Sequence, residues 1–546
     1  MPSSQIDDTT VYDLIGLGLG PANIAIAGAI IEKKGAKDQN SFPIKNALFI
    51  EKHQVFRWHP GMLLPEARMQ ISFMKDLATL RNPQSPITFL SYLHSQDRLI
   101  TFINRGSNIP SRKEYADYLS WAAQYVQEHG VDVLYGEEIT DLTRGKNDTI
   151  IVRSRNVLTG AERVLQARDI IISPGGGPRI PESLSTLTNH SSFQHSSSYA
   201  TSIGAILEPL ARASRPLRIA VVGSGQSAAE VTLDLRERLS LIPIQGSRHE
   251  VDMILRKGAL KPSDDSPFAN EIFDPAATDV WFNLPTDRIR ASKLAEYKST
   301  NYGVVNPRTL EVLYDVIYDQ KVDDAITQRT NVPKASNPRV NILPYSSIIA
   351  THINQVPGST SNGPLLAGEE ERTAESPFTL VIQNPISRVV SETNYDAIIC
   401  ATGYQRLSWI NILKNSDIGK IFGLHSNSAA VQLLPSSRLG RLDVDFDATS
   451  TSETPSPSNG SACSTPPTSP GPLAFSGHLD KLPDTVYISR NYQLLPAQSA
   501  SEEIASFKPR VYLQGVEEAT HGLSDTLLSV LGVRAGEVVA DLCARN

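Results

Sequence analysis

Two segments of the chain share a pattern in which an apolar strand runs into a glycine-rich turn and then into a helix. The first is YDLIGLGLGPANIAIAGAI, from Tyr12 to Ile30, and the second is PLRIAVVGSGQSAAEVTLDLRERL, from Pro216 to Leu239. In such a turn the first glycine permits a sharp bend and the second lets the backbone approach a pyrophosphate. The helix N-terminus then offers N–H groups and a positive dipole end to that anion. Each copy therefore predicts a Rossmann-like unit with a dinucleotide site.

Both turns depart from the G-x-G-x-x-G pattern at its third glycine. The second copy has Ala228 there, which is an accepted variant, whereas the first has Pro21. A lone turn of this kind also occurs without a ligand, but two copies about 200 residues apart, each in the right context, indicate two sites. The residues expected to contact the cofactors are Gly16, Gly18, Gly20, Pro21 and Asn23 in the first turn, and Gly223, Gly225, Gln226 and Ser227 in the second.

The residues that follow each turn predict which cofactor it binds. The strand NALFIE ends in Glu51, a candidate for the adenosine ribose hydroxyls, and the polar insertion GAKDQNSFPIKN explains its longer spacing from the turn. After the second turn the strand VDMIL is followed by Arg256 and Lys257. A cation there suits a 2′-phosphate, although Arg256 also fits a solvated surface charge. The pair of sites predicts FAD in the first unit and NADPH in the second.

Short apolar runs alternate with amphipathic patterns along the chain, which favours an α/β fold with mostly parallel sheet. We expect two Rossmann-like dinucleotide-binding domains, for FAD and NADPH, with a small substrate-binding region. The expected division is 1–210 for the first part of the FAD domain, 211–390 for the NADPH domain with substrate-contacting segments, and 391–546 for the second FAD part and a substrate-closing region. Ser, Thr, Pro and Gly dominate 447–476, which predicts a disordered insertion. The segments IIISPGGGPRIP and YDAIICATGY resemble crossings between two such domains, and Thr402 and Gly403 in the latter are expected to contact a cofactor.

Composition excludes several classes of protein. A net charge of −7 over 546 residues offers no basic surface for nucleic acid or an anionic membrane. The chain has no signal peptide and no long apolar run, so we expect a cytoplasmic location. Its three cysteines, Cys400, Cys463 and Cys543, form no C-x-x-C pair. That spacing argues against a disulfide framework, a metal site and a dithiol redox centre.

Seven segments in order along residues 11–534 resemble one enzyme family. They are GLGLGPANIAIA, FRWHPGMLLPEARMQISFMKDLATLRNP, GSGQSAAEV, LRKGALKPSDDSPFANEIFDP, TNYGVVN, ATGY and THGLSDTLLSVLGVR. The chain resembles the flavin-dependent N-hydroxylating monooxygenases of lysine and ornithine, and most of all those that act on ornithine. In this family G-x-G-x-G-P-A-N is the usual FAD turn, which accounts for Pro21 at a position where a helix tolerates proline.

The resemblance implies an activity and a set of partners. It implies N5-hydroxylation of L-ornithine by O2 through a C4a-hydroperoxide of FAD that NADPH has reduced, as the first step of hydroxamate siderophore biosynthesis. The homotetramer is the oligomeric state that it implies. Because the flavin carries the chemistry, no side chain is expected to act as a catalytic residue.

The resemblance also implies roles for particular residues. Lys75 would bind the substrate carboxylate, Asn270 and Ser529 would complete the amino-acid pocket, and Asn301 would lie between substrate and NADP. The residues expected beside the flavin are Trp58, His59, Met69 and Gln70. Each of these residues also has an interpretation without a binding role. Lys75 would then be a solvated lysine, the two asparagines would be turn residues, and Ser529 would be a helix serine bonded to its own backbone.

Other functions fit parts of the pattern. An L-lysine N6-monooxygenase differs by about one methylene of substrate, which sequence alone does not discriminate. Another two-dinucleotide monooxygenase would share both turns but lack the Lys75, Asn270 and Asn301 set. A pyridine-nucleotide disulfide reductase requires the paired cysteines that the chain lacks. A non-catalytic protein that retains the fold would be colourless when purified.

Overall fold

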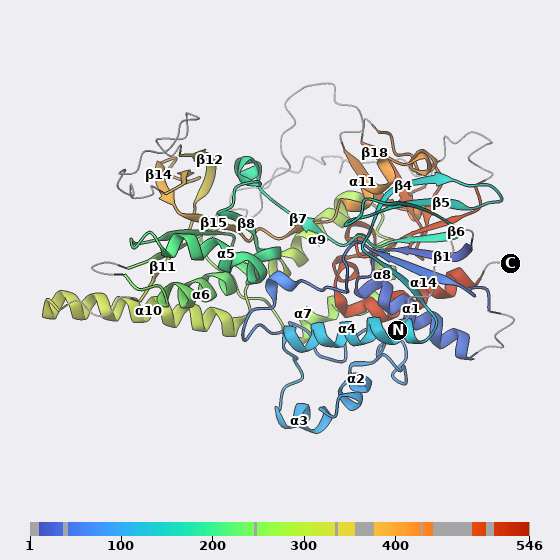
Figure 1. Cartoon of the computed structure of the whole chain (residues 1–546), viewed down its shortest axis with the longest axis horizontal. Coiled ribbons are helices and arrows are strands. Elements are labelled where there is room, and N and C mark those ends of the chain that lie inside the picture. Colours follow the sequence, from blue (N-terminus) through green and yellow to red (C-terminus); the bar gives the residue numbers. More distant parts are fainter. Residues whose placement is uncertain are drawn as a thin grey trace, which may run out of the picture.

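A computed structural model describes residues 10–36, 42–244, 248–332, 337–354, 376–426, 430–439, 483–497 and 507–544. The predicted insertion 447–476 lies outside these ranges. Two β-sheets lie side by side along the long axis of the molecule, each covered by helices (Figure 1). Within the described ranges, no helix combines the length and the apolar character that crossing a membrane requires.

The first sheet has the strand order β3-β2-β1-β6-β5-β4, with β20 also paired to β6. Its core is parallel, because β1 pairs with both β2 and β6, and β20 with β6, in parallel register. Helix α1 packs against α4 and α14. The bounds are β1 Val11–Leu17, β2 Ala47–Glu51, β3 Asp132–Tyr135, β4 Glu137–Arg144, β5 Ile150–Asn156, β6 Glu162–Ile172, β20 Arg510–Leu513, α1 Pro21–Ala36, α4 Arg112–Glu128 and α14 Leu531–Cys543.

The second sheet is parallel throughout, in the order β11-β10-β9-β15-β8. Buried apolar residues of β9 and β10 form its centre, as expected for strands covered on both faces. The bounds are β8 Phe193–His195, β9 Arg218–Val222, β10 Glu250–Ile254, β11 Arg339–Leu343, β15 Ala397–Cys400, α5 Tyr199–Ala211, α6 Gln226–Ser240 and α10 Pro307–Thr330. One sheet with a parallel core and one that is parallel throughout, each with a glycine turn after a central strand, confirm the predicted class of two Rossmann-like units.

The second sheet extends beyond the range 211–390 expected for it. Strand β8 precedes residue 211 and β15 follows residue 390, yet both pair in this sheet. The apolar run of β15 is clear in the sequence, but β8 has three residues and no alternation that could predict a partner. Sheet membership is decided here by pairing over long sequence separations, so local pattern does not place these boundaries.

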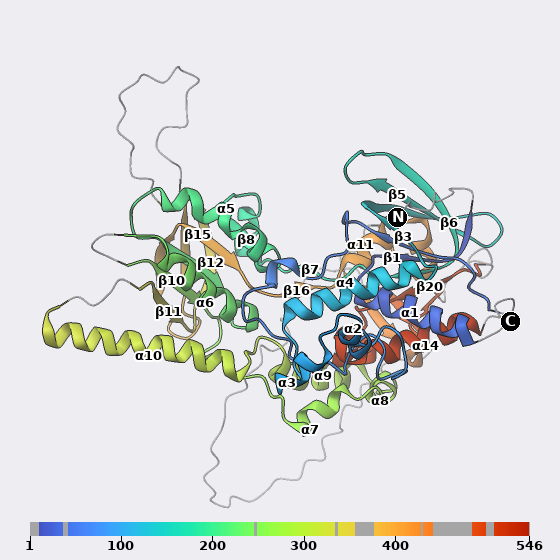
Figure 2. The ribbon, with the colours of Figure 1, turned by 60° about the horizontal axis from the view of Figure 1, so that its bottom comes forward.

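The chain crosses between the two sheets at a short antiparallel pair. Strand β7 (Gly177–Pro178) pairs with β16 (Tyr404–Gln405), and the backbone N–H of Arg179 donates to the carbonyl of Gly403 at 2.9 Å. Both strands lie between the two sheets in Figure 2. The segments predicted as crossings therefore lie against each other.

The segment between β10 and β11 contributes helices to both halves of the molecule. Helices α7 (Pro267–Asn270), α8 (Ala277–Phe282) and α9 (Asp287–Asn301) lie towards the first sheet, and α10 runs along the second (Figure 2). Both α8 and α9 contact α13 (Glu518–His521). The remaining elements are α2 Phe89–Ser95, α3 Leu99–Asn104, α11 Ser408–Lys414, β12 Ser347–Ile353, β13 Phe378–Gln383, β14 Val390–Tyr395, β17 Val431–Pro435, β18 Asp484–Ile488 and β19 Leu494–Leu495.

Gly61 marks a close contact between the two halves. It lies in the 3-10 turn η1 (Pro60–Met62), which contacts η3 (Ser196–Ser198) and α5. A Cβ placed on Gly61 would overlap the backbone of Ser197 and would lie 2.5 Å from the nitrogen of Ser198. Because backbone cannot move aside as a side chain tip can, glycine is required at this position.

We expect Gly61→Ala to lower the free energy of unfolding by about 1–3 kcal/mol, because the added methyl overpacks this contact. Urea unfolding followed by circular dichroism measures the change. Gly35→Ala in α1 is the control, since no atom lies within 4 Å of a Cβ there. It should stabilise the helix by up to ~1 kcal/mol. Equal stability of the two variants would contradict the proposed close contact.

Candidate functional site

The first glycine turn is held in place by close packing. A Cβ on Gly18, whose φ is 92°, would lie 2.5 Å from the carbonyl oxygen of Ser173, and one on Gly16 would overlap the ring of Phe49. Helix α1 begins at Pro21, as predicted, and nothing lies within 4 Å of a Cβ on Gly20. The turn therefore leaves open space at a helix N-terminus, which is where a pyrophosphate binds.

Two polar side chains hold this turn in position through hydrogen bonds. The amide nitrogen of Asn23 donates to the carbonyl of Gly18 at 2.7 Å, and its fully buried Oδ1 has no hydrogen-bond partner among the described residues. Glu51 ends β2, and its carboxylate accepts from the backbone N–H groups of Leu19 and His53, each at 2.9 Å. The open turn, the orphaned Asn23 oxygen and the oriented carboxylate fit the diphosphate and ribose of FAD.

The second turn repeats this geometry after β9. A Cβ on Gly223, with φ 148°, would overlap the carbonyl of Ala401, so a side chain is excluded. Gly225 is the N-cap of α6, and a Cβ placed there would lie 3.4 Å from the Cα of Gly303. Ser227 is half-buried in the first turn of the helix. The turn thus packs directly on the TNYGVVN segment.

Gln226 is engaged with protein rather than left open to a ligand. Its side-chain oxygen accepts from the backbone N–H of Asn306 at 2.7 Å, while its amide nitrogen donates to Thr309 at 3.0 Å and to Glu230 at 2.8 Å. These bonds tie the second turn to the start of α10. The cofactor contact predicted for Gln226 stays a prediction, for a residue whose side chain is already bonded to protein.

Three cations gather beyond the end of β10. Arg256, Lys257 and Lys261 are exposed, and burial together with the charges of Lys261 and Arg256 lowers the pKa of Lys257. Mutual repulsion among cations is relieved by an anion, so the cluster fits the 2′-phosphate of NADPH. The sequence singled out Arg256 and noted Lys257, but it missed Lys261, because the residues between them gave no pattern.

An aromatic group surrounds the segment predicted to lie beside the flavin. The ring of His59, a residue with φ 42°, lies 5.2 Å from Trp58 and 5.5 Å from Tyr404 between centroids. Burial, and to a smaller extent the charge of Arg112, lowers the pKa of His59, so its imidazole is neutral at pH 7. Met69 is buried and Gln70 is exposed.

The crossing residues Thr402 and Gly403 bond to residues of the other crossing segment and of β8. The hydroxyl of Thr402 donates to the carbonyl of Arg179, and the carbonyl of Gly403 accepts from Nε2 of His195 at 3.0 Å. Gly403 has φ 81°, with open space where its side chain would be. This opening fits a close approach of backbone to a cofactor.

Lys75 lies in a half-buried position without an ion pair among the described residues. Its Nζ is 5.3 Å from the ring centroid of Phe273, which favours a cation–π contact. Burial lowers the pKa of Lys75. Phe273 follows Asn270 by three residues, so the structure brings two of the predicted substrate segments together. An ammonium group that is partly desolvated and unpaired can bind a carboxylate.

The other predicted substrate residues lie on neighbouring segments. Ser529 is buried in η8 (Leu528–Val530), and a Cβ on Gly532 would lie 3.1 Å from the carbonyl of Leu77, close to Lys75 in sequence. The amides of Asn270 and Asn301 donate to backbone carbonyls of their own segments, Asp265 and Tyr297, each at 2.9 Å.

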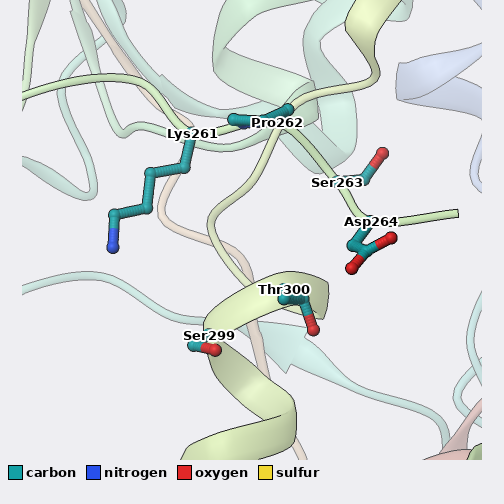
Figure 3. A pocket seen from close by; sticks show the side chains of 6 residues that line it. All are labelled: Lys261, Pro262, Ser263, Asp264, Ser299 and Thr300. Atoms are coloured by element: carbon teal, nitrogen blue, oxygen red, sulfur yellow. The ribbon is translucent and has the colours of Figure 1, made fainter. Parts of the chain in front are cut away.

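A cavity of about 490 Å³ lies beside Asn301, between the end of α9 and the strand-like segment before α7. Figure 3 shows Lys261 and Asp264 at opposite ends of that segment, with Ser299 and Thr300 on the helix beside it. Its lining residues are Lys261, Pro262, Ser263, Asp264, Ser299 and Thr300. It connects the cation cluster to the end of α9.

Two Rossmann-like units, with a carboxylate at the first turn and cations beyond the second, define a flavoprotein that also uses a nicotinamide cofactor. Residues 10–360 match the family described as L-lysine 6-monooxygenase/L-ornithine 5-monooxygenase. The chain belongs to this family.

Relatives and solved structures agree with this assignment. An L-ornithine N(5)-monooxygenase of Coprinopsis cinerea is 56% identical, over 98% of this chain and 98% of the relative. Among solved structures, the ornithine hydroxylase of Pseudomonas aeruginosa has a TM-score of 0.69 at 31% identity, covering 98% of this chain and 99% of the other. An ornithine N-hydroxylase of Kutzneria sp. 744, described with reduced FAD, NADP+ and L-ornithine, has a TM-score of 0.68 at 26% identity, covering 98% and 99%.

We expect Arg256→Ala to raise the KM for NADPH roughly 10- to 100-fold, because it removes a charged hydrogen bond to the 2′-phosphate. The KM for NADH, which lacks that phosphate, should stay unchanged. Initial rates of nicotinamide oxidation measure both constants. Arg168→Ala, at an exposed ion pair with Asp13, serves as the control. Equal effects on the two cofactors would assign Arg256 to the protein surface.

Proposed function

We propose that this chain catalyses the N5-hydroxylation of L-ornithine with FAD, NADPH and O2, as the first step of hydroxamate siderophore biosynthesis. The observation that carries the proposal is the half-buried Lys75, which has no ion pair within the described ranges, in a chain that has both dinucleotide turns. The choice of ornithine is supported by the names of the relatives that match along the whole chain.

The protein's own part in this reaction is to bind, orient and shield. The ammonium group of Lys75 would pair with the substrate carboxylate, and Asn270, Asn301 and Ser529 would hydrogen-bond the amino-acid head. The terminal amine must be neutral to react, although its free pKa is near ~10.4, and an apolar, water-poor surrounding favours that form. FAD, when bound and reduced by NADPH, would activate O2 for transfer of one oxygen atom to that amine.

The division of labour between the two halves is part of the proposal. The sheet around β1, formed from residues 11–172 and 510–513, would hold FAD, and the sheet around β9, formed from residues 193–400, would hold NADPH. Helices α7 to α9 would bring the substrate segments to the first half. The homotetramer and the cytoplasmic location stay predictions.

The reaction is tested by following NADPH oxidation and hydroxylamine formation together on FAD-loaded protein. L-Ornithine should yield about one hydroxylamine per NADPH, whereas L-lysine and no amine should yield hydrogen peroxide or little turnover. Equal yields with lysine would favour the lysine enzyme instead. Peroxide with every amine would leave the cofactor sites standing and would remove the substrate roles given to Lys75, Asn270 and Ser529.

We expect Lys75→Met to lower kcat/KM for L-ornithine roughly 10- to 100-fold, because a charge-assisted contact with the carboxylate is lost. The same variant should change kcat/KM for 1,4-diaminobutane, which has no carboxylate, far less. Steady-state hydroxylamine assays measure both. Lys508→Met, at an exposed ion pair with Asp148, is the matched control. A loss shared by both amines would contradict the role in carboxylate binding.

A pH series on the same proteins tests the charge of Lys75. Its pKa lies below the ordinary lysine value because of burial, so as pH rises its positive charge is lost earlier than that of an exposed lysine. The ratio of kcat/KM for ornithine to that for 1,4-diaminobutane should therefore fall towards alkaline pH in the wild type. In Lys75→Met the part of this fall that Lys75 causes should be absent. If the ratio falls identically in both proteins, titration of the substrate causes the fall.

A further inference from the structure

Glu230 lies where three segments far apart in the sequence meet. Its carboxylate accepts two hydrogen bonds from the guanidinium of Arg112, at 2.7 and 3.0 Å, and one from the amide of Gln226 at 2.8 Å. The side chains of Arg112 and Glu230 are 16% and 10% exposed. A bidentate ion pair of this kind fixes the mutual orientation of the two side chains as well as their distance.

Arg112 ties this carboxylate to the half that would hold the flavin. It is the first residue of α4, its Nη1 donates to the carbonyl of Met62 at 3.3 Å, and its backbone N–H donates to Ala67 at 2.9 Å. Met62 ends the turn that begins after His59. One end of α4 reaches towards the second half of the molecule (Figure 2).

On the other side, Gln226 carries the connection into the nicotinamide half. It is the first residue of α6, at the second glycine turn, and it holds Asn306 and Thr309 at the start of α10. The turn residue Gly225 also packs on Gly303. A chain of hydrogen bonds therefore runs from the segment beside the flavin, through Arg112 and Glu230, to the phosphate turn and the segment that contains Asn301.

A buried ion pair is weak evidence for stability, because desolvation offsets its attraction. Its best-attested use is to specify one geometry, and here it joins the two units that must present their cofactors to each other. A misplacement of about 1 Å between reacting groups can cost about 100-fold in rate. At this contact the ion pair is therefore more important for positioning the two units than for the free energy of unfolding.

We propose that Arg112 and Glu230 are positioning residues that hold the second glycine turn at the distance and angle from the flavin that hydride transfer requires. The inference rests on the proposed use of FAD and NADPH. Neither side chain needs to touch the reacting atoms, because each acts through the segments it holds.

The test measures reduction of the bound flavin by saturating NADPH, without oxygen and without amine, in stopped flow. Glu230→Gln and Arg112→Met should each slow reduction roughly 10- to 100-fold. The double variant should be no slower than the slower single variant, because both changes break one unit. Arg112→Lys keeps the positive charge but loses the two parallel hydrogen bonds to Glu230, so its rate of flavin reduction should be intermediate. The variants should also yield less hydroxylamine per NADPH with ornithine.

The matched control is the ion pair of Arg81 with Glu32. Its side chains are 14% and 13% exposed, and Arg81 also donates from two nitrogens to one carboxylate. Glu32→Gln should lower Tm about as much as Glu230→Gln while leaving flavin reduction at the wild-type rate. If Glu230→Gln folds with FAD and is reduced at the wild-type rate, the inference is wrong.

The control variants separate this inference from the proposed function. A wild-type flavin that NADPH does not reduce would contradict the proposed function itself. If NADPH reduces the wild-type flavin and Glu230→Gln is reduced at the same rate, only the positioning role is contradicted. Should Glu230→Gln not fold, an unchanged rate in Arg112→Lys gives the same result. A double variant with the product of both single losses would show two independent effects and would also overturn it.

Discussion

In both halves of the molecule, a glycine of the nucleotide turn packs against the carbonyl of the residue that follows the neighbouring parallel strand. Gly18 meets Ser173 after β6, and Gly223 meets Ala401 after β15. A side chain at either glycine would push these strands apart. The same two strands lead directly into β7 and β16, so the contact that forms each turn also delivers the chain to the crossing between the halves.

Features encoded in local sequence could be predicted. The apolar runs of β1, β2, β9 and β10, the helix start at Pro21 and the carboxylate of Glu51 at a strand end follow from periodicity and turn chemistry. Strand β8 and the course of α7 to α9 could not be predicted, because they depend on contacts across long sequence separations. The disagreement at the domain boundaries has this one cause.

The candidate site shows the same division between motif and contact. The resemblance selected Lys75, and the structure adds what a motif lacks, namely its partial burial against Phe273 and its lack of an ion pair among the described residues. Glu230 stands within the GSGQSAAEV segment but at no position of its glycine pattern, and Arg112 lies outside both glycine-turn segments. Each is an ordinary charged residue on a helix until tertiary structure places one opposite the other. Such pairs are invisible to motif reading because only their mutual distance gives them meaning.

Three of the rings beside the crossing belong to His59, His195 and Tyr404. The cations predicted to meet the anionic ends of substrate and cofactor are Lys75 and Arg256. Burial lowers the pKa of His59 and of His195 and raises that of Tyr404, so all three rings are uncharged at pH 7. Arg179 adds a cation at the crossing itself, where its Nε donates to the carbonyl of Thr402 at 3.2 Å. The Arg112–Glu230 pair can then act there on geometry without adding net charge, because its two charges cancel.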